Sequence, residues 1–185
     1  TAVATMGRMR VKHAAVLLPN GNVLVVGGGS QLGGTGATPT TEIYNPAANT
    51  WTNGPTMNSA RNSPEITELP NGNFLISGGA TSLTIFDVYD PIANTMTPIP
   101  GADYAFNEHS TIPLPSGEIL ITTNGNSLST WTFGDSRIFR YDPVTQARNS
   151  MNFIGTNSLA ARLASGNVMM EFIENEFVEL NPSLE

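Results

Sequence analysis

Residues 18–28 read LPNGNVLVVGG, a tight turn followed by an apolar strand and a glycine pair. Residues 69–79 repeat this block almost letter for letter as LPNGNFLISGG. Weaker copies follow as LPSGEILI at residues 114–121 and as LASGNVMM at residues 163–170. The copies lie roughly fifty residues apart, an interval typical of repeat proteins. The sequence therefore predicts four tandem repeats.

Each repeat is expected to form four short antiparallel strands. The Asn20-Gly21 pair favours positive φ at both central turn positions, as two-residue hairpin turns require. No segment keeps a 3.6-residue apolar period, so helix is expected to be nearly absent. The predicted strands are 14–18, 23–26, 42–44 and 50–52; 65–69, 74–77, 85–89 and 95–97; 111–114, 119–122, 137–141 and a weak strand around Ala147; and 159–163, 168–172 and 177–180.

The two chain ends predict how the repeats are arranged. Aligned on the repeat, Thr1 falls level with Thr52 and Glu185 falls level with Asn49. We therefore expect an all-β fold, a β-propeller of four four-stranded blades in a single domain. Residues 1–6 would complete the last blade and leave no open sheet edge. The alternative is four blades of a longer propeller. The expected repeats are roughly 7–57, 58–104, 105–151 and 152–185 plus 1–6.

Composition excludes several classes of function. The net charge is −7 and the pI is near 4.7, whereas a nucleic-acid groove needs clustered lysine and arginine. No run of 18 apolar residues is present, so we expect no membrane insertion. Charged residues make up only 12% of the chain, and Asn, Thr, Ser and Gly are expected to cover much of the surface. This composition favours an exported or surface-associated protein.

The first repeat resembles the kelch repeat. The resemblance rests on residues 9–28 with their terminal glycine pair, the EIYNP stretch at residues 42–46, and Trp51. The second repeat has Met96 at the tryptophan position, and the third has Thr123-Asn124 in place of the glycines. The bacterial and galactose-oxidase-like branch of the family is the most similar. The resemblance implies a β-propeller but no particular activity, because this fold carries many unrelated functions.

Loop lengths indicate which face of the predicted propeller carries function. In a four-stranded meander, the connections from the second to the third strand and from the fourth strand to the next blade emerge on one face. The connections from the second to the third strand are long at residues 29–39 and 125–136, and short at residues 80–82 and 174–175. Binding sites tend to lie on variable loops held by a rigid scaffold, so we expect the functional site on this face.

Both histidines fall on the expected functional face. His13 and His109 each lie eight residues before a turn glycine, so they are expected to face each other across the ring. The alternative is that each hydrogen-bonds its neighbouring blade. Two histidines without a third ligand predict no metal site. On the third loop, Trp131 would either contact a ligand or fold back over the core. The candidate ligand-binding residues are Arg10, His13, Arg61, Glu65, Asn107, His109 and Trp131.

The sequence favours a non-catalytic binding module for a protein or a glycan. No catalytic motif and no cofactor site is predicted, and without cysteine the cysteine-linked tyrosine of galactose oxidase is excluded. A second interpretation is a carbohydrate epimerase, lyase or hydrolase using His13, His109 and Glu108, since a histidine pair can run acid–base chemistry near neutral pH. A third is a rigid structural domain or a fragment of a larger propeller, which would self-associate if its ring were incomplete.

Overall fold

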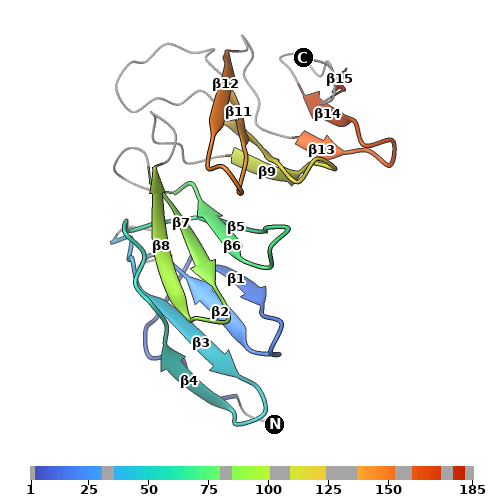
Figure 1. The fold of residues 1–185 in the computed structure, drawn as a ribbon. Coiled ribbons are helices and arrows are strands. Elements are labelled where there is room, and N and C mark those ends of the chain that lie inside the picture. The colour runs from blue at the N-terminus through green and yellow to red at the C-terminus, as the bar shows by residue number, and fades with distance from the viewer. Residues whose placement is uncertain are drawn as a thin grey trace. The chain divides into compact units, whose positions relative to one another are not determined.

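The computed structural model describes residues 3–30, 36–79, 85–100, 109–123, 137–152, 160–171 and 177–181. The described residues contain strands and turns but no helix, and the strands form four separate antiparallel sheets (Figure 1). The chain divides into two compact units, residues 1–105 and 106–185. Each unit holds two of the described sheets, and the division falls one residue after the expected boundary between the second and third repeats. The single-domain arrangement stays a prediction. The part of the chain that the structure describes holds no helix with the length and apolar character needed to cross a bilayer.

Two four-stranded sheets make up the first unit. The first sheet has the order β1-β2-β3-β4 and the second has the order β5-β6-β7-β8, so each strand pairs with its neighbours in the chain. The predicted strands are confirmed, within a few residues at their ends. Their bounds are β1 Ala14–Leu17, β2 Val23–Val26, β3 Thr41–Asn45, β4 Thr50–Asn53, β5 Glu65–Glu68, β6 Phe74–Ser77, β7 Ile85–Asp90 and β8 Thr95–Pro100.

The core of the first unit lies between its two sheets. One buried cluster joins residues of both sheets: Leu18, Leu24, Val26, Met57, Phe74, Ile76 and Tyr89. Along β6 all four residues are buried, as expected for a strand whose two faces are both covered. The continuous apolar runs in the first two repeats therefore mark the strands at the centre of the unit.

The second unit contains one four-stranded and one three-stranded sheet among its described residues. Their orders are β12-β11-β10-β9 and β13-β14-β15. The strand expected weakly around Ala147 is β12, which is five residues long and begins at Arg148. A buried cluster of Ile112, Leu114, Leu120, Ile138 and Val168 forms the core. The bounds are β9 His109–Pro113, β10 Ile119–Thr123, β11 Arg137–Tyr141, β12 Arg148–Asn152, β13 Ala160–Arg162, β14 Val168–Glu171 and β15 Phe177–Leu180.

The turn that defines the repeat is built in the same way in all four sheets. Gly21, Gly72, Gly117 and Gly166 have φ angles of 82°, 81°, 89° and 90°, a left-handed conformation that glycine adopts without strain. In each turn the preceding leucine N–H donates to the carbonyl four residues later, at 2.7 Å in the first repeat and 2.8 Å in the other three. The fourth repeat, whose sequence match is the weakest, has the same turn geometry as the other three.

The N-terminal segment packs on the first sheet. The Ala4 N–H donates to Asn49 Oδ1 at 2.8 Å, and Trp51 Nε1 donates to the Ala4 carbonyl at 2.9 Å. The Trp51 ring also packs against the Tyr44 ring in a tilted arrangement, with ring centroids 4.9 Å apart. Closure of the ring through residues 1–6 concerns both units and stays a prediction.

Candidate functional site

The connections of the first unit that were expected on one face do lie together. The segment that leads into β1 is bridged to the segment that follows β2, because Val11 and Gly29 exchange two backbone hydrogen bonds, each 2.9 Å long. The segment that leads into β5 joins them through a bridge between Thr38 and Arg61. We call the described residues 7–13, 27–30, 36–40 and 54–64 the connection face.

Arg10 is buried beneath the connection face, where it forms an ion pair with Glu42. Its Nε and Nη2 atoms donate to Glu42 Oε1 at 3.1 and 2.9 Å. Its Nη1 donates to the Gly27 and Thr40 carbonyls at 2.8 and 2.9 Å, and Nη2 also donates to Thr40 Oγ1. The second oxygen of Glu42 accepts the Gly7 N–H at 2.7 Å. The guanidinium therefore ties the entering segment to both β2 and β3.

Arg61 repeats this arrangement in the second sheet. Its Nε and Nη2 atoms donate to Asp87 Oδ2 at 3.2 and 2.9 Å, and its Nη1 donates to the Gly78 carbonyl at 2.8 Å. The other oxygen of Asp87 accepts the Asn58 N–H at 2.8 Å. We call the Arg10–Glu42 and Arg61–Asp87 pairs the two clamps.

The clamps give both arginines a structural role. Their side chains are only 1% exposed, and their carboxylate partners are 5% and 0% exposed. Such buried charges require a close partner and further hydrogen bonds to offset the loss of water, and the clamps supply both. Arg10 and Arg61 were predicted to contact a ligand, but the structure places their donors inside the fold. A ligand on the connection face would meet other side chains.

Glu42 and Asp87 were missed by the sequence analysis. Each lies in the third strand of its sheet, opposite Val25 and Ile76 respectively, which are both four residues after the turn glycine. The signal was present, because an acidic residue in the middle of a strand that pairs with a continuous apolar strand is expected to be buried with a partner. In the third sheet the same position holds Phe139, opposite Ile121.

At the glycine pairs, the backbone of a neighbouring connection comes very close to the glycine residues. A Cβ atom on Gly27 would lie 2.7 Å from the Arg61 carbonyl oxygen, and one on Gly28 would lie 2.7 Å from that of Val11. The Gly28 N–H donates to the Arg61 carbonyl at 2.8 Å. The pair therefore allows the connection into the second sheet to bond directly to the end of β2.

The histidines occupy equivalent positions, as predicted. His13 is exposed and immediately precedes Ala14, the partner of Val26, whereas His109 is half-buried and pairs with Thr123 at the start of β9. They belong to different units, so their approach across a ring stays a prediction. Glu65 is half-buried at the start of β5, opposite Ser77.

The remaining predicted site residues, Asn107, Glu108 and Trp131, lie outside the described residues. Within the described ranges, no group of three or more His, Asp or Glu residues could hold a metal ion.

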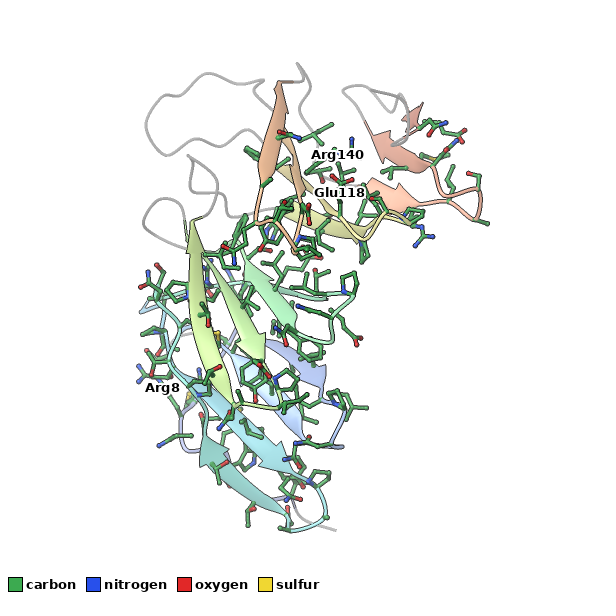
Figure 2. All side chains as sticks on the ribbon, in the orientation of Figure 1. Arg8, Glu118 and Arg140 are labelled. Atoms are coloured by element: carbon green, nitrogen blue, oxygen red, sulfur yellow. The ribbon has the colours of Figure 1, made fainter. Side chains whose placement is uncertain are left out.

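A different charged pair is found in the second unit. Arg140 of β11 donates to Glu118 Oε2, just before β10, and the two side chains lie next to each other in Figure 2. The Ser116 hydroxyl donates to the same carboxylate oxygen at 2.9 Å. The Arg140 and Glu118 side chains are 19% and 24% exposed. This pair links two strands near the surface and does not replace the clamp, whose carboxylate position is taken by Phe139.

Comparison with known proteins agrees with the architecture of the first sheet. A family model described as Kelch motif matches residues 10–58. The match begins at the clamp residue Arg10 and covers the glycine pair and all four strands of the first sheet. No curated protein matches the chain. The first sheet therefore matches a kelch motif, and the four antiparallel sheets of the described residues are consistent with kelch β-propeller blades.

Proposed function

We propose that this protein is a non-catalytic module that binds a protein partner through its connection face. The observation that carries the proposal is that the variable connections of the first unit are bonded into one surface. Val11 pairs with Gly29, and Thr38 pairs with Arg61. These bonds hold the described parts of the connections in place, and rigid backbone beneath variable side chains is a general feature of binding surfaces.

The turns at the end of the sheets away from the connection face also support the connection face as the binding surface. The turns after β3 and β7 share one geometry, in which Asn45 or Asp90 accepts N–H groups two and three residues later. The turns at Gly21 and Gly72 are also alike. The turns at this end therefore have the same geometry in both sheets of the first unit, whereas the connections on the opposite face differ in length and sequence. An exported or surface-bound setting is part of the proposal and follows from composition.

The experiment combines selection with loop substitution. The whole chain is screened against a displayed random-peptide library and, in parallel, against a glycan array. In separate variants, alanine replaces residues 31–35, which join two segments of the connection face in the chain, and residues 126–133 of the equivalent connection in the third repeat. Trp131→Ala is also made alone. We expect selected peptides to bind about tenfold more weakly to at least one loop variant.

Turn variants at the opposite end serve as the matched control. Ala47→Ser and Ile92→Ser should leave peptide binding unchanged. Ligands that bind all the loop variants as tightly as the wild type would show that the face is wrongly assigned. Selection of glycans alone would replace the protein partner with a carbohydrate.

A further inference from the structure

The two connections of the first unit that carry clamp arginines have the same backbone but different side chains. Residues 7–13 read GRMRVKH, and residues 58–64 read NSARNSP. In both, the first residue donates its N–H to the clamp carboxylate, at 2.7 and 2.8 Å, and the fourth residue is the clamp arginine. The sixth residue is left-handed in both, with φ angles of 55° at Lys12 and 56° at Ser63.

The remaining side chains of residues 7–13 are not needed to build this backbone. Arg8, Met9, Lys12 and His13 are all exposed, and Met9 is 76% exposed. The corresponding residues of the second connection are small or uncharged, and they support the same hydrogen bonds. Large cationic and apolar side chains at these positions therefore do not serve the fold.

The charge of this segment is opposite to that of the chain. The lysine and arginine residues of the first unit are Arg8, Arg10, Lys12 and Arg61, and the clamps neutralise two of them. Both remaining cations lie within residues 8–13, on a chain of net charge −7. Among the residues that the structure describes, neither Arg8 nor Lys12 contacts a carboxylate. Figure 2 shows Arg8 at the outer margin of the unit.

We propose that residues 8–13 are a docking site for an extended acidic segment of a protein partner. Arg8 and Lys12 would pair with carboxylates, and an apolar side chain of the partner would pack on Met9, whose flexible thioether adapts to varied shapes. Four residues of extended chain span at most about 14 Å, so carboxylates about four residues apart in the partner can reach both cations. The inference rests on the proposed function and deepens it.

The test uses synthetic acidic peptides and the second connection as a template. An array holds short peptides with glutamates at varied spacing around one leucine, together with versions in which glutamine replaces every glutamate. Binding to the whole chain is measured by fluorescence polarisation at low and physiological ionic strength. We expect at least one acidic peptide to bind about tenfold more tightly than its glutamine version, with the difference shrinking as salt rises.

The decisive variants carry the residues that the second connection uses. Arg8→Ser with Lys12→Ser should weaken acidic-peptide binding about tenfold, and Met9→Ala should weaken it by a smaller factor for both charged and glutamine peptides. The control Arg162→Ser removes another exposed cation, in the second unit, and should change binding less than about twofold. An unchanged melting temperature for each variant shows that the fold is intact.

Two results would overturn the docking site. Either no acidic peptide outcompetes its glutamine version, or the double serine variant binds as the wild type does. If library-selected ligands still lose affinity on loop substitution, the proposed function stands and only residues 8–13 are wrongly assigned. If no ligand of any kind depends on the connection face, both proposals fail.

Discussion

Single residues in left-handed conformation recur at the ends of the turns that join the third and fourth strands. Asn49, Asn94 and Gln146 occupy the same turn position, with φ angles of 53°, 52° and 59°. Asparagine tolerates this region better than other side chains, because its short amide can hydrogen-bond locally. Asn49 and Asn94 each use Oδ1 to accept a tyrosine hydroxyl, at 2.9 and 3.0 Å. Gln146 is the poorer residue for this backbone.

Gln146→Asn is therefore expected to stabilise the protein. Relief of the left-handed strain should raise the free energy of unfolding by about 0.5–1 kcal/mol. Urea denaturation measures the change. The reverse exchange in the second sheet, Asn94→Gln, should be destabilising by at least as much. A stability loss in Gln146→Asn would contradict the assigned turn geometry.

Glycines in the repeat differ in what surrounds them, and this difference predicts unequal tolerance to alanine. Gly21 has φ +82° with no atom within 4 Å of an added Cβ, whereas an added Cβ on Gly79 would overlap the Asn62 carbonyl oxygen. Gly21→Ala should cost about 1 kcal/mol from backbone strain alone. Gly79→Ala should cost roughly 2 kcal/mol more, because the Asn62 backbone must move. Equal losses of stability in urea would refute the close approach.

At the level of strands, the two clamps hold each entering segment against the third strand of its sheet. Removing one member of the second clamp should leave a buried charge without its partner. We expect Arg61→Met and Asp87→Leu each to lower the free energy of unfolding by about 3–5 kcal/mol. The double variant should lose much less than the sum of the two.

A double-mutant cycle in guanidinium chloride measures this coupling. Arg140→Met with Glu118→Leu, at the more exposed pair, provides the comparison and should show coupling of about 1 kcal/mol or less. Additive losses at Arg61 and Asp87 would mean that the clamp is not a unit.

The hairpin of β7 and β8 is expected to lose stability in alkaline solution. Burial raises the pKa of Tyr89 above its ordinary value of 10.0, and the nearby charge of Asp90 raises this pKa further. Because the folded-state pKa is the higher one, the stabilisation is fully present below pH 10 and is lost as the pH rises through the folded-state pKa.

Tyr89→Phe tests this pH dependence. Thermal unfolding between neutral pH and strongly alkaline pH should show a smaller decline in melting temperature for the variant than for the wild type. Parallel curves for the two proteins would show that Tyr89 does not titrate differently in the folded state.

Strand positions could be predicted from sequence, but the clamps could not be predicted in full. An apolar run after an Asn-Gly turn identifies β2 and β6, because both turn chemistry and burial agree there. The strand β12 was underestimated, since its residues Arg148–Asn152 are largely polar and carry little apolar pattern. Pairing Arg10 with Glu42 required the fold, because 32 residues separate them in the chain.

At the scale of the whole molecule, the two units differ in how they bury charge. The first unit encloses two ion pairs, whereas Phe139 and Val178 stand at the corresponding positions of the third and fourth sheets. The sequence residue equivalent to Arg10 in the third repeat is Phe106, so arginine and carboxylate are both replaced there. Local pattern predicts each sheet, whereas ring closure would depend on contacts between distant repeats and stays a prediction.

Hydrogen exchange can show whether a ligand binds to the connection face. Exchange is followed by mass spectrometry on the whole chain, with and without the tightest-binding acidic peptide. We expect slower exchange in residues 7–13 and 27–30, which include the backbone amides of Val11 and Gly29, and no change in the turns at 45–49, 90–94 and 142–146. Protection confined to those turns, with residues 7–13 unchanged, would contradict a binding role of the connection face.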